Sequence, residues 1–258
     1  CLLSRGLGDV YKRQSLNYSS NFSSKKRNKS QIKFIIFHYT GMKSEKAAIK
    51  RLTDVKSEVS CNYLIKKNGD IITMVPDLYI SWHAGKSSWK NYQSLNKNSI
   101  GIEITNPGHS NGYKKYSNSQ IKSLIELSKT LINKYKINLE NILGHSDIAP
   151  ERKKDPGEKF PWKYLAKKHI GYWHNLNEKF LVKNRKLEIN SLQKKIFLKN
   201  LIKIGYPIKR FKNLELNSEK YLKMIIKAFQ RRFRQDLING IIDKECLIIS
   251  QNLAEKLN

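Results

Sequence analysis

The order of hydrophobic and polar positions predicts that strands and helices alternate over the first two thirds of the chain. Residues 32–38 form an apolar run interrupted by a single lysine, which is typical of a strand buried on both faces. Residues 99–105 alternate between apolar and polar side chains and place Glu103 on the polar face of a second strand. Residues 141–143 predict a third, short strand. Strands separated by helical segments indicate an α/β domain built in layers.

A hairpin and two helices are predicted between these strands. The hairpin covers residues 62–75, because an Asn-Gly pair lies between two apolar runs and favours a tight turn. Ser44 can cap a helix that follows it directly. Ser117 and Gln120 have the spacing of a capping box, and the apolar positions after them recur at helical intervals.

The last third of the chain has a different pattern, because its apolar positions predict three short helices and no strand. The first 14 residues resemble translated adaptor sequence and not native protein, and residues 15–30 are rich in Ser, Asn and Lys. We therefore predict four segments: a non-native tail and polar linker over residues 1–30, an α/β domain over 31–175, a polar linker over 176–187, and a small all-α domain over 188–258.

Charge is the unusual feature of the composition, with 50 Lys and Arg against 21 Asp and Glu and a net charge of +29. A basic chain suggests a nucleic-acid partner. The excess is spread along the whole chain, however, and no nucleic-acid partner is expected. Two explanations remain open: a compositional bias of the source genome, or attraction to an anionic polymer such as a cell-wall matrix.

The cysteines and the apolar runs do not assign the protein to a cellular compartment. Cys61 and Cys246 fall in different predicted domains and Cys1 in the suspect tail, so no disulfide framework is expected. No apolar run approaches the ~20 residues that a membrane helix needs. Residues 1–14 lack the apolar core of a signal peptide, and we expect an export signal to be missing together with the true N-terminus.

Candidate chemistry is concentrated in residues 37–40, 100–104 and 144–157. His38, His145 and Asp155 supply two histidines and one aspartate, which is the donor set of a catalytic zinc site with one open position. Either histidine alone is more typical of a buried, hydrogen-bonded side chain than of a metal ligand. Together with the aspartate in a loop rich in Pro and Gly, they predict a Zn²⁺ site.

Residues 144–157, which read GHSDIAPERKKDPG, resemble the signature of the type-2 N-acetylmuramoyl-L-alanine amidases, zinc enzymes that cut peptidoglycan. The resemblance covers about residues 32–162. It implies a mixed central sheet flanked by helices, as in peptidoglycan-recognition proteins. It also implies that His38, His145 and Asp155 bind zinc.

The same resemblance implies roles for three further residues. Glu103 matches a glutamate that moves a proton of the zinc-held water, and Lys153 matches a lysine that stabilises the oxyanion. His83, in the phrase Trp-His-Ala-Gly, is predicted to line the substrate groove, with support of the site as the alternative. His109, His169 and His174 match nothing in the family pattern and are expected at the surface or in packing.

One departure from the pattern lies just before the hairpin, where relatives read Ser-Ala-His-Tyr. This chain has Cys61 and Asn62 at the two central positions. The lost histidine is not one of the three inferred ligands. The departure therefore affects the expected substrate preference and not the metal site.

The C-terminal segment has a resemblance of its own. Residues 191–193, 204–206 and 228–234 resemble the peptidoglycan-binding three-helix module. This implies that residues 188–258 bind peptidoglycan, and we expect them to fold independently. A helical appendage without that role is the alternative.

These observations predict a zinc-dependent enzyme that hydrolyses the amide bond between N-acetylmuramic acid and L-alanine in peptidoglycan or muropeptides. A non-catalytic peptidoglycan receptor of the same fold is the alternative. We expect a monomer without a transmembrane segment. The wall-binding module favours the cell envelope or periplasm, and a cytoplasmic location is the alternative.

Overall fold

The computed structural model describes residues 14–16, 18–208 and 218–257. The predicted non-native tail lies outside the described residues except for residue 14. The strands are β1 (Gln14–Leu16), β2 (Phe22–Ser23), β3 (Phe34–Tyr39), β4 (Tyr63–Ile65), β5 (Ile71–Thr73), β6 (Ile80–Ser81), β7 (Ser88–Trp89), β8 (Tyr92–Gln93), β9 (Ser99–Ile104) and β10 (Ile142–Gly144). The α-helices are α2 (Glu45–Thr53), α3 (Asn118–Tyr135), α4 (His145–Ile148), α5 (Trp162–Lys167), α6 (Glu178–Lys183), α7 (Ser191–Ile204), α8 (Ser218–Phe233) and α9 (Lys244–Glu255).

The main sheet has the strand order β1-β5-β4-β9-β3-β10. Strands β4, β9, β3 and β10 are mutually parallel, whereas β5 runs antiparallel to β4. Helix α3 covers one face of this sheet, and its Leu124, Leu127 and Leu131 share a core with Ile35 and Phe37 of β3. The predicted mixed sheet flanked by helices is therefore confirmed.

Local signals placed these elements well. Ser44 caps α2 through the Ala47 backbone N–H, and Ser117 and Gln120 form the predicted capping box of α3. The hairpin of β4 and β5 is also present, but its turn differs from the two-residue turn that the Asn-Gly pair suggests. Of that pair only Gly69 has a positive φ, of 93°, and a longer turn joins the strands.

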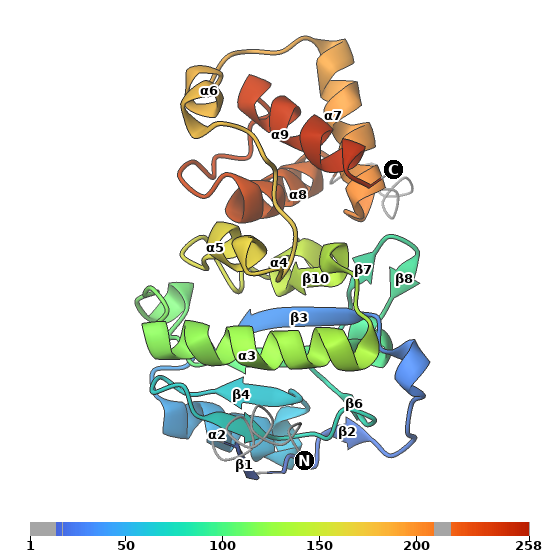
Figure 1. The fold of residues 1–258 in the computed structure, drawn as a ribbon, viewed down its shortest axis with the longest axis vertical. Helices are drawn as coiled ribbons and strands as arrows, with labels where there is room; N and C mark the ends of the chain where they lie inside the picture. Colours follow the sequence, from blue (N-terminus) through green and yellow to red (C-terminus); the bar gives the residue numbers. More distant parts are fainter. Residues whose placement is uncertain (1–13, 17, 209–217, 258) are drawn as a thin grey trace, which may run out of the picture.

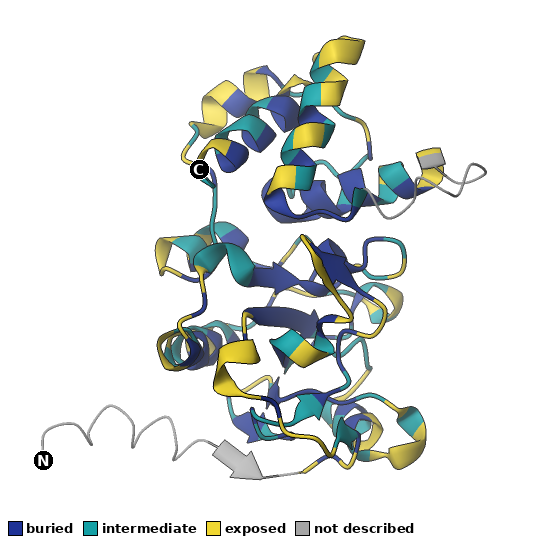
Figure 2. Cartoon of the chain, turned by 90° about the vertical axis from the view of Figure 1, so that its right-hand side faces the viewer, coloured by how far each residue is buried: buried dark blue, intermediate teal, exposed yellow. Residues whose placement is uncertain are grey.

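The C-terminal helices share a hydrophobic core with the sheet. Side chains alternate along β3, so Phe34 and Ile36 point away from α3 and join a buried cluster with Phe197 of α7 and Phe229 of α8. The helices lie beyond the β10 edge of the sheet, next to α4 and α5 (Figure 1), and their outer faces are the exposed ones (Figure 2). The three predicted helices are present and pack against the α/β part of the chain, and independent folding of residues 188–258 stays a prediction.

A buried ion pair crosses the same boundary. Arg232 of α8 donates to the Asp147 carboxylate of α4 at 2.7 Å and to the backbone carbonyl of Ile142 at 2.9 Å. Tyr206 donates to the other Asp147 oxygen at 2.8 Å, and the guanidinium lies 4.3 Å from the ring centroid of Trp162. Both charged side chains are at most 2% exposed. The C-terminal helices are therefore attached to α4 by polar contacts as well as by apolar packing.

Residues 18–30 are not a free linker, so this part of the predicted polar linker is wrong. Asn21 and Arg27 are 1% and 4% exposed. Arg27 donates twice to the carbonyl of Asp77, at 2.9 and 2.8 Å, and once to that of Ser99 at 2.7 Å. A guanidinium has five N–H donors, and here several satisfy carbonyls of separate loops. The segment 176–187 likewise contains α6, whose Leu181 is buried.

Candidate metal centre

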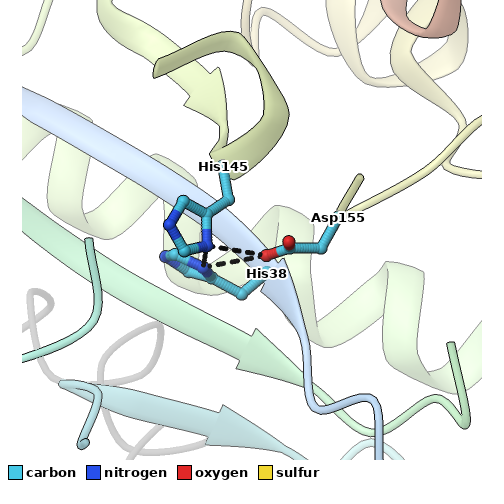
Figure 3. A group of neighbouring side chains, drawn as sticks. All are labelled: His38, His145 and Asp155. Carbon is cyan, nitrogen blue, oxygen red and sulfur yellow. Dashed lines mark hydrogen bonds and ion pairs between the residues drawn. The ribbon is translucent and has the colours of Figure 1, made fainter. Parts of the chain in front are cut away.

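The predicted ligands meet at the carboxyl edge of the parallel strands. His38 is the penultimate residue of β3, and His145 directly follows the last residue of β10 as the first residue of α4. Asp155 comes from the loop after α4. The carboxyl ends of parallel strands are where open α/β sheets bind their ligands. Figure 3 shows the three side chains converging from these separate segments.

The three donor atoms form a small triangle. The Nδ1 atoms of His38 and His145 are 2.9 Å apart, and Oδ2 of Asp155 lies 3.1 and 3.0 Å from them. All three side chains are buried. Bonds of about 2.0–2.2 Å in tetrahedral geometry place zinc ligands roughly 3.3–3.5 Å apart. The triangle is close to that size.

Protonation supports the same conclusion. Nε2 of His145 lies 3.2 Å from the carbonyl oxygen of Ala84, which can only accept, so Nε2 carries a proton and Nδ1 is the nitrogen that faces Asp155. Burial, followed by the facing His145, lowers the pKa of His38 to about 4, so His38 is neutral. Burial would raise the pKa of Asp155, but the two histidines outweigh it and hold this pKa well below its usual range. The neutral ring of His38, the Nδ1 edge of His145 and an ionised carboxylate facing one another fit a dication.

Glu103 lies on β9, in register with His38 on the adjacent strand. Its Oε2 atom is buried and has no hydrogen-bond partner within the described part of the chain. Burial, together with the charge of Asp155, raises the pKa of Glu103 to about 8, and the positive charge of Lys153 acts in the opposite direction. Glu103 is therefore a carboxylate poised to accept or release a proton near neutral pH.

Lys153 lies in the loop two residues before Asp155 and is half-buried. It lines the same cavity as Glu103, His145 and Asp155. This cavity measures about 520 Å³, within the range of small-molecule sites. A mobile ammonium at its wall can approach a developing negative charge.

The cavity also carries residues to which the sequence pattern assigned no role, namely Arg51, Trp82, His109 and Arg152. His109 was expected at the surface or in packing. It is half-buried, and its ring nitrogens lie 2.9 Å from the Tyr39 hydroxyl and 3.0 Å from a Glu158 oxygen. Of the other two unmatched histidines, His169 is exposed and His174 is buried outside this cavity.

His83 touches the cavity but is only 8% exposed, and its Nδ1 lies 3.0 Å from Nε2 of the predicted ligand His38. Burial, followed by the nearby His38, lowers the pKa of His83 well below its usual value, so the ring is neutral. The ring lies over Gly101, where an added Cβ would be 2.3 Å from His83 Cγ. This position favours support of a ligand, the alternative interpretation, over recognition of substrate.

The departure at Asn62 has a structural explanation. Its Oδ1 accepts from the Gly101 backbone N–H at 3.0 Å and from the Ser81 hydroxyl at 2.8 Å, and its Nδ2 donates to the Val75 carbonyl at 3.1 Å. The amide thus ties β9 to β6 and to the segment after β5. The sequence change leaves the three converging ligands in place.

Residues 28–158 match the family model described as N-acetylmuramoyl-L-alanine amidase. The curated N-acetylmuramoyl-L-alanine amidase AmiD of Escherichia coli is 35% identical over 238 residues, covering 88% of this chain and 83% of AmiD. The solved complex of AmiD with anhydro-N-acetylmuramic acid-L-Ala-D-γ-Glu-L-Lys has a TM-score of 0.76 at 33% identity and covers 91% of each chain. AmpDh3 of Pseudomonas aeruginosa with anhydromuramic pentapeptide has a TM-score of 0.75 at 29% identity, covering 94% of this chain and 98% of AmpDh3. These matches extend past residue 158 into the C-terminal helices.

Within the described residues, no helix is both long and apolar enough to cross a membrane.

Proposed function

This chain belongs to the N-acetylmuramoyl-L-alanine amidase family and hydrolyses the amide between N-acetylmuramic acid and L-alanine, and we propose that the reaction takes place at His38, His145 and Asp155 with Zn²⁺ as cofactor. The observation that carries the proposal is the convergence of two imidazole Nδ1 atoms and an ionised carboxylate on one point. When bound, zinc would polarise the scissile carbonyl and acidify a water molecule.

The protein's own groups supply the proton transfers and charge stabilisation. Glu103, partly buried on the strand beside His38 and with a pKa of about 8, takes a proton from the attacking water and delivers it to the leaving amine of L-alanine. Lys153 stabilises the negative charge that develops on the carbonyl oxygen.

We propose muropeptides as substrates because the two similar solved complexes hold anhydromuramyl peptides. The cationic side chains of Arg51 and Lys154 on the cavity wall suit the carboxylates of a stem peptide. All five proposed catalytic and ligand residues come from a single chain, and we propose that the enzyme acts as a monomer. We further propose that the outer surface of residues 188–258 binds the wall polymer and that the enzyme works in the cell envelope.

The zinc site is tested by metal analysis. The purified protein should contain about one zinc per chain, whereas His38→Ala and His145→Ala should lose it, since each removes one of three ligands. The control His169→Asn alters an exposed histidine and should keep wild-type zinc, and Asn tolerates its φ of 60°.

Release of free L-alanine amino groups from an anhydromuramyl peptide should stop on chelation and return when zinc is added. Full zinc content in either ligand variant would contradict the assignment. A wild type that stays fully active without metal would contradict the zinc mechanism.

A further inference from the structure

A line of hydrogen bonds leads from the far side of the His38 ring to the protein backbone. Nε2 of His38 is 3.0 Å from Nδ1 of His83, and Nε2 of His83 is 3.1 Å from the Ser99 hydroxyl oxygen. The Ser99 hydroxyl in turn lies 2.6 Å from the carbonyl oxygen of Leu95. All three side chains in this line are buried.

The backbone carbonyl fixes the direction of every hydrogen bond in the line. The Leu95 carbonyl can only accept, so the single proton of the Ser99 hydroxyl is donated to it. The Ser99 oxygen is then free to accept from His83, which places the His83 proton on Nε2. A neutral imidazole has one N–H, so Nδ1 of His83 is an acceptor and takes the Nε2–H of His38. Nδ1 of His38 is left bare, facing His145 and Asp155.

We propose that His83 and Ser99 are positioning residues that hold His38 in the tautomer able to bind zinc, an inference that rests on the proposed zinc site. His145 obtains the same tautomer from the Ala84 carbonyl. The two ligands thus receive their orientation from neighbouring residues of one loop. Second partners of this kind orient a ligand ring and raise its affinity for metal.

The loop that carries His83 is itself fixed. The backbone N–H groups of His83 and Ala84 both donate to the Asn96 side-chain oxygen, at 3.1 and 2.7 Å. The ring rests over Gly101, where a larger residue would displace it. A histidine that only contacted a variable substrate would not need both its backbone and its ring to be fixed in this way.

The test measures the zinc affinity of the full-length apoprotein by competition with a chelator. His83→Leu removes the acceptor for His38 and should weaken zinc binding by about 10–100-fold. His83→Asn places an amide oxygen near the position of Nδ1 and should restore most of the affinity. His174→Leu, the control, removes a buried histidine outside the cavity and should bind zinc like the wild type.

A second readout follows the position of the His38 ring proton directly. Nitrogen-15 NMR of the zinc-free wild type should find the His38 proton on Nε2, and Ser99→Ala should increase the fraction with the proton on Nδ1. Wild-type affinity in His83→Leu, or a His38 proton resident on Nδ1 in the wild type, would overturn the inference. A wild type that binds no zinc would instead overturn the proposed function.

Discussion

Substitution of Glu103 by Gln is expected to lower the rate of muropeptide cleavage by about 10²–10⁴-fold and to leave zinc binding close to that of the wild type. The amide keeps the shape of the carboxylate but cannot accept a proton. Because the buried Oε2 atom of Glu103 has no hydrogen-bond partner among the described residues, replacing the carboxyl group by an amide should not lower thermal stability. The measurements are release of L-alanine amino groups, zinc content and the melting temperature.

Glu188→Gln is the matched control, because it changes an exposed carboxylate outside the catalytic cavity and should keep wild-type activity. Equal activity of Glu103→Gln and the wild type would assign the proton transfer to another group. A wild type that holds zinc and binds muropeptides without cleaving them would favour the receptor over the enzyme.

Replacing Arg232 by Met should lower the free energy of unfolding by about 3–5 kcal/mol, because it leaves the Asp147 carboxylate buried without its cation. The loss should appear in urea unfolding of the metal-free protein. It should also weaken zinc binding, since Asp147 belongs to the same short helix as His145.

The double variant Asp147→Asn/Arg232→Met should recover part of this loss, because no buried charge is then left unpaired. Lys223→Met replaces an exposed cation on the same helix and should change stability by less than about 0.5 kcal/mol. An Arg232→Met protein as stable as the Lys223→Met control would show that the ion pair does not hold the helices to the sheet.

Elements that depend on neighbouring residues could be predicted from the sequence. The apolar run of β3, the alternation in β9 and the capping box of α3 are each decided within a few positions. The ligand set required more, because His38 and His145 are 107 positions apart. Only the resemblance of the surrounding phrases joined them, and the parallel strands supply the physical reason that they meet.

Contacts between residues far apart in the sequence could not be predicted. Arg232 lies in a basic run that suggests a solvated surface, yet its partner is 85 positions away. Arg27 lies in a segment of linker-like composition. Nothing in the neighbouring sequence indicates that it donates hydrogen bonds to carbonyls 50 and 72 positions away. The proposed positioning role of His83 rests on the direction of one ring within a loop, which sequence spacing cannot specify.

The core shared by β3, α7 and α8 also limits how the α/β domain can be separated from its C-terminal helices and fused to another module. A wall-binding module that is joined to an enzyme only by a flexible linker can be exchanged for another module. Here a cut between the halves would uncover Trp89, which packs on Tyr206, and would leave the buried Asp147 without Arg232. A chimera that gives this sheet a different targeting module must therefore keep the native helices and append the new module beyond them.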